Sequence, residues 1–138
     1  MDETLPSVKV RAFLVFCAVG LVPIVLGYGA IPSTSLDVLF GITVDTINLT
    51  HIMRAVMGLY IGMVVIWVWG AFDKKMADPA LVSCAVFMLG LAAGRILSFI
   101  VDGMPHWLLV VYAMLEVLLG LIAIVIYRSK TLSQNHMR

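Results

Sequence analysis

Charged side chains are scarce in this sequence: they make up 12% of its 138 residues, against 62% hydrophobic residues. A soluble domain carries about a quarter charged residues, so this composition excludes a water-soluble globular protein. Cysteine is scarce as well, since Cys17 and Cys84 are the only two. They form no CxxC pair, and we expect small apolar packing residues there and no disulfide.

Motifs for catalysis or cofactor binding are also missing. The sequence has no HxxxH, HExxH or CxxC spacing, no glycine-rich phosphate loop, no nucleophile elbow and no basic patch for nucleic acid. We therefore expect no cofactor, no catalytic residue and no nucleic-acid partner. A metal or haem site at His51 and His106 is conceivable, because an aspartate lies close to each histidine in the sequence. It is the weaker alternative, since none of the usual ligand spacings is present.

What the sequence does contain is hydrophobic residues in four runs, at about 12–30, 52–72, 80–101 and 106–127. Each run has close to the roughly 20 residues that a helix needs to cross the hydrocarbon core of a membrane. Four crossings use nearly the whole chain. We therefore predict one domain over residues 1–138, an all-α integral membrane four-helix bundle, with the polar tail after residue 128 disordered.

Lysine and arginine are absent from two connections between these runs, 31–50 and 102–105. The third connection contains Lys74 and Lys75, and basic residues also precede the first run and follow the fourth. Short loops rich in lysine and arginine stay in the cytoplasm. We therefore predict that both termini and the 73–79 loop are cytoplasmic.

The first run is long for a signal peptide, so we expect an uncleaved first helix, kinked near Pro23. In the 31–50 connection, Ser35 is a candidate N-cap for a short helix on the outer membrane surface. This segment is interpreted either as a lid over the outer mouth of the bundle or as a plain spacer. Asn48 or Thr50 is expected to cap the second crossing helix.

Several charged residues occur inside the membrane runs. A charge at the centre of a membrane helix costs about 2.5 to 3.5 kcal/mol, so we expect these groups to face inward and pair. Arginine suits such pairing because its planar fork can bridge a carboxylate with two bonds. We predict that Arg95 bonds Glu116, and that Arg54 joins Asp102 or Asp45. The predicted polar cluster is His51, Arg54, Tyr60, Arg95, Ser98, Asp102 and Glu116, with Asp45, Asn48 and His106 at the outer rim.

Three roles for this cluster remain open. It could fix the register of four helices, it could bind an anionic or polar head group from the outer leaflet, or Glu116 could relay protons. Two pairs of glycines, Gly58 with Gly62 and Gly90 with Gly94, form small-xxx-small motifs. Such motifs let helix backbones approach closely, within one chain or between copies.

The runs LFGI at 39–42, NLTHIMRAVMGLYIG at 48–62, FMLGLAAGRILS at 87–98 and DGMP at 102–105 resemble a family of small bacterial four-helix membrane proteins. That family is catalogued as a domain of unknown function, number forty-three forty-five. The resemblance covers about residues 20–128 and implies the fold and a bacterial inner-membrane location, but no activity. It nominates as motif positions Asn48, His51, Arg54, Tyr60, Arg95, Ser98 and Asp102. A looser likeness to DoxX-like four-helix proteins rests on architecture alone.

The function we expect is that of a small inner-membrane protein that is not an enzyme. It would bind a lipid-like or quinone-like ligand, or a partner subunit, through the buried cluster in its periplasmic half. The alternative is a membrane enzyme or proton-coupled carrier that uses Glu116 and Arg95. The expected partners are membrane lipid, a hydrophobic small molecule or another membrane protein, and further copies of the chain.

Overall fold

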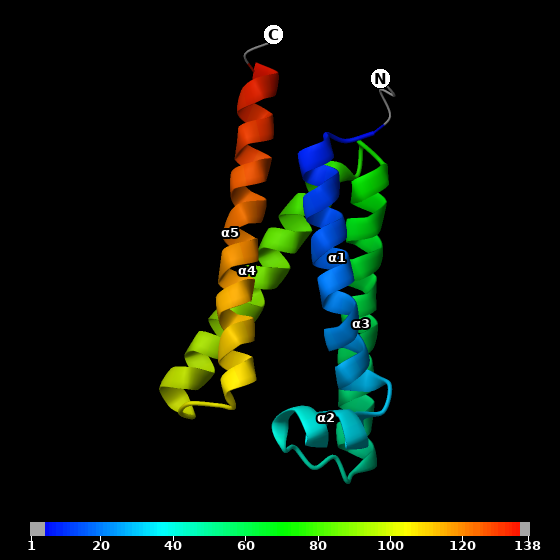
Figure 1. Ribbon diagram of the computed structural model, residues 1–138, viewed down its shortest axis with the longest axis vertical. Coiled ribbons are helices and arrows are strands. Elements are labelled where there is room, and N and C mark those ends of the chain that lie inside the picture. Colours follow the sequence, from blue (N-terminus) through cyan, green and yellow to red (C-terminus); the bar gives the residue numbers. More distant parts are fainter. Residues whose placement is uncertain (1–4, 136–138) are drawn as a thin grey trace.

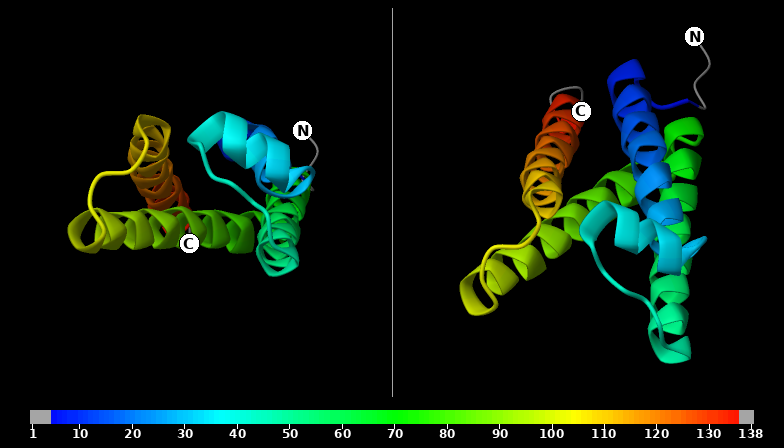
Figure 2. Two further views of the ribbon diagram at one scale, coloured as in Figure 1. Left: turned by 90° about the horizontal axis from the view of Figure 1, so that it is seen from below. Right: turned by 60° about the horizontal axis from the view of Figure 1, so that its bottom comes forward.

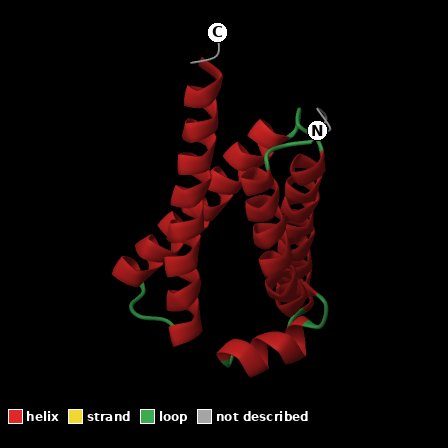
Figure 3. Cartoon of the chain, turned by 45° about the horizontal axis from the view of Figure 1, so that its top comes forward, coloured by secondary structure: helices red, strands yellow, loops and turns green. Residues whose placement is uncertain are grey.

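The computed structural model describes residues 5–135, which contain five helices and no strand (Figure 3). The long helices are α1 (Val8–Gly29), α3 (Ile47–Phe72), α4 (Ala77–Val101) and α5 (Trp107–Asn135), and the short helix α2 (Pro32–Phe40) lies between α1 and α3. The predicted all-α fold is confirmed.

Four of the described helices are long and apolar enough to cross a membrane: α1, α3, α4 and the part of α5 from Trp107 to Lys130. Within their most apolar windows, only 22% to 33% of the residues are buried inside the chain. Large apolar side chains such as Val19, Ile100 and Met114 are therefore exposed over most of the surface. A surface of this kind is stable in lipid and not in water, so the chain is a membrane protein.

The helices are arranged as two pairs. Helix α1 packs along α3, and α4 packs along α5, while α3 and α4 are joined by a short turn and diverge from it (Figure 1). The start of α1, the end of α5 and the turn at 73–76 lie at one end of the molecule, here called the terminal end. Helix α2 and the 102–106 connection lie at the opposite end, here called the α2 end (Figure 1).

The core lies where α1, α3 and α4 meet. Its fully buried side chains include Leu14 of α1, Trp67 of α3 and Leu81 of α4. The Trp67 Nε1–H donates a hydrogen bond of 3.3 Å to Ser83 Oγ, so the polar atom of this large side chain is satisfied. Both cysteines, one on α1 and one on α4, are free and buried in this core, as the sequence indicated.

The glycine motifs do not pack helices within the chain, so this part of the expectation is wrong. A Cβ atom built at any of the four positions would meet nothing within 4 Å: Gly58, Gly62, Gly90 and Gly94. Close approaches occur at other glycines. A Cβ at Gly70 would clash with Ala80 of α4, and one at Gly120 would lie 2.6 Å from Leu89 Cγ. Packing of the four exposed glycines between copies stays a prediction.

The ends of the helices also differ from the expected ones. Helix α2 begins at Pro32, and Ser35 lies inside its first turn, where its hydroxyl donates to the Ile31 carbonyl at 2.6 Å. Helix α3 is capped by Thr46, whose Oγ1 accepts from the backbone N–H of Leu49 at 3.2 Å. The cap therefore precedes Asn48 and Thr50, because α3 starts earlier than the apolar run. Helix α5 continues to Asn135, so most of the tail predicted to be disordered is helical; residues 136–138 lie outside the described part.

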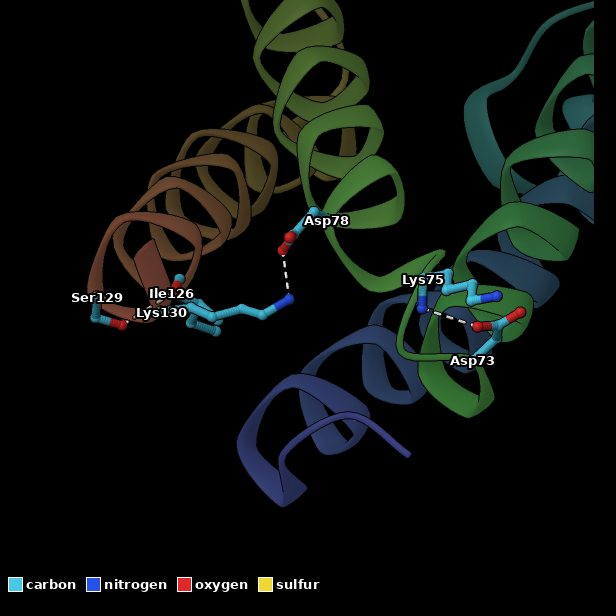
Figure 4. A network of polar contacts seen from close by, with 6 residues as sticks. All are labelled: Asp73, Lys75, Asp78, Ile126, Ser129 and Lys130. Atoms are coloured by element: carbon cyan, nitrogen blue, oxygen red, sulfur yellow. Dashed lines mark hydrogen bonds and ion pairs between the residues drawn. The ribbon is translucent and has the colours of Figure 1, made fainter. Parts of the chain in front are cut away.

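Polar contacts hold the terminal end together (Figure 4). Lys130 Nζ of α5 lies 2.6 Å from Asp78 Oδ1 in the first turn of α4. In the turn between α3 and α4, the backbone N–H of Lys75 donates to Asp73 Oδ1 at 2.8 Å. The first contact joins two helices, whereas the second only shapes the turn.

Candidate ligand groove

A cavity of about 330 Å³ lies between α1, α4 and α5. Most of its lining is aliphatic, and Phe16, Cys17 and Gly20 of α1 form part of one wall. Its polar groups come from Tyr60 of α3, Arg95 of α4, and Tyr112 and Glu116 of α5. The cavity therefore combines an apolar wall with a small number of convergent polar groups, as ligand pockets commonly do.

The central contact of this cavity is the ion pair of Arg95 and Glu116. Arg95 Nε lies 3.0 Å from Glu116 Oε1 and 2.9 Å from Oε2, so one N–H is shared between both carboxylate oxygens. The side chains are 18% and 10% exposed. An ion pair this short and this well shielded neutralises two charges that would be costly to leave separate in a membrane. The pair predicted from the sequence is confirmed.

Aromatic rings surround the ion pair. The guanidinium carbon of Arg95 lies 5.9 Å from the centroid of the Tyr112 ring, a cation–π distance. The buried ring of Tyr60 lies 6.0 Å from that of Tyr28 and 5.0 Å from that of Phe87, both edge to face. These contacts bring α1, α3, α4 and α5 together around the guanidinium.

A second cavity, of about 360 Å³, adjoins the first on the side of the α2 end. The two share Gly20, Ile24, Tyr112 and Leu115 in their linings, so they are neighbours between α1 and α5, and together they are here called the α1–α5 groove. Leu39 and Phe40 of α2 also line the second cavity. Helix α2 therefore forms part of the groove lining at the α2 end, and its interpretation as a lid stays a prediction.

Phe40 connects α2 to aromatic rings of α1 and α5 and of the connection before α5. Its ring is stacked on that of Tyr28 at 6.2 Å, and it meets the rings of Tyr112 at 6.4 Å and His106 at 6.2 Å edge to face. Seen from the α2 end, α2 extends from the α1–α3 pair toward α5 (Figure 2). Among the described residues, Phe40 is thus the one α2 side chain whose ring contacts Tyr112 of α5 and His106 just before it.

The structure brings together three members of the predicted polar cluster: Tyr60, Arg95 and Glu116 line the same cavity. It does not bring Arg54 to them. Arg54 and His51 are exposed on α3, and within residues 5–135 Arg54 forms no ion pair with Asp102 or Asp45. For Asp102 the reason is the divergence of α3 and α4, whose ends at the α2 end lie apart (Figure 2).

The remaining predicted residues also lie outside the groove lining. Ser98 and Asp102 are exposed at the end of α4, where the Ser98 hydroxyl donates to Asp102 Oδ2 at 2.8 Å. Asp45 and Asn48 are exposed before and at the start of α3. His106 Nδ1 accepts from the backbone N–H of Leu108 at 3.4 Å and so helps to start α5. Ser98, Asp102 and His106 thus make local contacts at the α2 end.

Most of the lining residues were not among the predicted site residues, and the aromatic ones Tyr28, Phe40 and Tyr112 are the most informative of these. Tyr112 precedes Glu116 by one helical turn, so the sequence already places both on the same face of α5, although Tyr112 was not predicted as a site residue. Tyr28 and Phe40 gave no such signal, since each is one aromatic residue among many apolar ones. No group of three His, Cys, Asp or Glu side chains within the described range is placed to hold a metal ion.

The sequence matches the family described as Domain of unknown function (DUF4345) over residues 10–127. No curated protein matches the chain, and no solved structure does.

Proposed function

Since the chain belongs to this family, whose description assigns no activity, we propose a function from the geometry alone: the protein is a non-enzymatic membrane module that binds one lipid-like or quinone-like molecule in the α1–α5 groove. The observation that carries this proposal is the juxtaposition of an apolar cavity and the Arg95–Glu116 pair inside a membrane-spanning bundle.

The groove is large enough to hold a small-molecule ligand. Its two cavities measure about 330 and 360 Å³ and each exceeds the roughly 300 Å³ at the lower end of small-molecule pockets. The polar groups gather in one region, while aliphatic side chains such as Ile24 and Leu119 line the rest. An amphipathic molecule with one polar head and one apolar chain fits this division.

The groove is open sideways, toward the bilayer. Phe16 of α1 and Leu118 of α5, which line the first cavity from opposite walls, are 65% and 54% exposed. Their apolar side chains lie on helices that cross the membrane, so the surface they expose faces hydrocarbon. A hydrophobic ligand would therefore enter between α1 and α5 from the lipid phase.

The position of the protein in the cell is part of the proposal. We place it in the bacterial cytoplasmic membrane, with the terminal end in the cytoplasm and the α2 end in the periplasm. The distribution of basic residues supports this orientation, since Lys74 and Lys75 lie in the turn at the terminal end. The polar groups of the groove then lie between the membrane centre and the periplasmic face.

Native mass spectrometry tests the proposal on the full chain, extracted with its surrounding lipid into polymer discs. Gly20→Phe fills the shared wall of the groove, where an added Cβ meets nothing within 4 Å. Gly62→Phe, at an equally open position outside the groove lining, is the matched control. We expect wild type and Gly62→Phe to retain one bound small molecule per chain, and Gly20→Phe to lose it. Equal retention by all three proteins, or no bound molecule in any, contradicts the proposal.

A further inference from the structure

The polar groups that line the groove are mostly hydrogen-bond donors. The one carboxylate, Glu116, is held by Arg95, whose single Nε–H is shared between the two carboxylate oxygens. The other polar side chains are the guanidinium of Arg95 and the hydroxyls of Tyr60, Tyr112 and Tyr28. The guanidinium can only donate and each tyrosine hydroxyl can donate as well, so this set can serve a ligand head that presents acceptor oxygens.

Arg95 has unused donors. A guanidinium carries five N–H groups, and only the one on Nε bonds Glu116, which leaves the four on the two Nη atoms. Among residues 5–135 no side-chain nitrogen or oxygen is both fully buried and unpaired. The remaining Nη donors therefore reach accessible space, and the cavity that Arg95 lines provides it.

Tyr60 adds a second donor from the opposite side. Its residue is 6% exposed and lines the cavity, and its hydroxyl forms none of the side-chain hydrogen bonds found in the described part of the chain. A buried tyrosine hydroxyl usually has a partner. Tyr60 and Arg95, from α3 and α4, thus offer donors to one ligand head from two helices.

The net charge at this point decides between a neutral and an anionic head. Arg95 is neutralised by Glu116 at 2.9 Å, and Arg54, the second arginine expected to attract an anion, is exposed on α3 away from the groove lining. An anionic head would meet the Glu116 carboxylate in a medium of low dielectric constant, where like charges repel strongly. A neutral acceptor receives the Nη donors without this repulsion.

We infer that the ligand head is uncharged and carries carbonyl-type oxygens that accept hydrogen bonds from Arg95 and Tyr60, as a quinone-like head would. This inference rests on the proposed function, because it assigns the chemistry of the same groove. It excludes the phosphate and carboxylate heads that the sequence alone left open. The apolar tail then extends along α1 and α5 toward the lipid.

Binding of four synthetic probes to the full chain in lipid discs tests the inference. Decylbenzoquinone carries a neutral head with two carbonyl acceptors, decyl phosphate carries an anionic head, and decylbenzene carries none; each is titrated against wild type and the groove-filled Gly20→Phe. We expect specific binding of decylbenzoquinone by wild type, at least about tenfold tighter than that of the other two, since two hydrogen bonds contribute about 1 kcal/mol each. Decanol, a neutral head with one acceptor oxygen, is the fourth probe and should be intermediate.

Two variants identify the groups that make this choice. Glu116→Gln leaves the charge of Arg95 uncompensated, so decyl phosphate should become the preferred probe. Tyr60→Phe removes one donor without changing any charge, and should weaken decylbenzoquinone about three- to tenfold while decylbenzene stays unchanged. If Glu116→Gln does not fold, the Tyr60→Phe result decides alone.

Each failure has its own signature. A wild type that prefers decyl phosphate, or a Tyr60→Phe variant that binds decylbenzoquinone as wild type does, overturns the neutral-acceptor head but leaves the groove as a binding site. Probe binding that Gly20→Phe does not reduce, or no binding of any probe, overturns the groove itself and with it the proposed function.

Discussion

Lys130 Nζ lies 2.6 Å from Asp78 Oδ1, so α4 and α5 are joined by an ion pair at the terminal end as well as by Arg95 and Glu116 deeper in the membrane. Two ion pairs at different depths fix the register of one helix against the other. The partner pair, α1 and α3, contains no ion pair within the described residues and is held by close apolar packing, such as that of Gly29 against Met57.

This difference explains where the groove lies. Contacts are extensive within each helix pair, whereas between the pairs most of them join α3 and α4, which are connected by a short turn. Helices α1 and α5 touch little, and the space between them is the groove. The same splaying leaves α2, through Phe40, to bridge the pairs at the α2 end. A ligand in the groove would therefore also add contacts between the two pairs.

Glu116→Gln should lower the stability of the protein in detergent. The substitution keeps the shape of the side chain but leaves the Arg95 guanidinium without its counter-charge at a site only 18% exposed. Removing one partner of a buried ion pair costs about 3 kcal/mol at the lower end of the usual range. Thermal unfolding followed by tryptophan fluorescence should show a clearly lower Tm.

The pair at the terminal end provides the control. Asp78→Asn removes the partner of Lys130 where the Asp78 side chain is 46% exposed, so solvent screens the lost charge and the cost should stay below about 1 kcal/mol. The double variant Arg95→Gln/Glu116→Gln should recover part of the loss, with a coupling of about 1 to 3 kcal/mol. Equal melting of Glu116→Gln and wild type would show that the ion pair does not stabilise the bundle.

Gly70→Ala should destabilise the turn region between α3 and α4. An added Cβ at Gly70 would clash with the Ala80 methyl and lie 2.9 Å from the Met76 carbonyl oxygen, which is backbone and cannot rotate away. Overpacking of this kind costs about 1 to 3 kcal/mol. The measurement is again the Tm in detergent.

Gly62→Ala, eight residues earlier on the same helix, is the matched control because its Cβ would meet nothing within 4 Å. In an isolated chain it should leave the Tm unchanged or raise it, since alanine favours a helix by up to about 1 kcal/mol over glycine. A Tm loss at Gly62 as large as that at Gly70 would mean that this face of α3 packs against another copy.

Hydropathy was sufficient to predict the architecture, because four apolar runs in a short chain permit little besides four crossing helices. The ends of the helices were less predictable than their number. Ile47, Asn48 and Leu49 belong to α3 although only some are apolar, since a helix end is fixed by the Thr46 cap and not by hydropathy. The glycine motifs misled for a similar reason. A motif shows that close packing is allowed, but only the packing of neighbouring helices decides which glycine is used.

The candidate site was predictable where an unpaired charge would have a high free energy in the membrane. Arg95 and Glu116 lie at similar depths in consecutive helices, and their pairing follows from the cost of leaving either alone. Arg54 lies nearer the end of its helix, where its long side chain can extend toward the membrane surface, so pairing is not required. The angle between α3 and α4 keeps Arg54 away from Asp102, and no sequence pattern encodes that angle.

Phe40→Ala should loosen the cover of the groove without unfolding the bundle. The ring contacts Tyr28, Tyr112 and His106, and each aromatic contact contributes on the order of 1 kcal/mol. Hydrogen–deuterium exchange should therefore rise in residues 32–40 while the four long helices stay protected. Val38→Ala is the control, because Val38 is 78% exposed on the same short helix. Unchanged exchange in the Phe40 variant would show that α2 is held by other contacts.

Single cysteines on either side of the bundle should report opposite sides of the membrane. Thr43 and Lys75 are exposed at the α2 end and in the turn at the terminal end, and the native thiols of Cys17 and Cys84 are buried and so poorly reactive. In intact bacterial cells that express the protein, a membrane-impermeant maleimide should label Thr43→Cys at once and Lys75→Cys only after the inner membrane is permeabilised. The reason is that lysine-rich turns resist translocation across the membrane. Labelling of Lys75→Cys in intact cells would invert the orientation and move the polar part of the groove to the cytoplasmic half of the membrane.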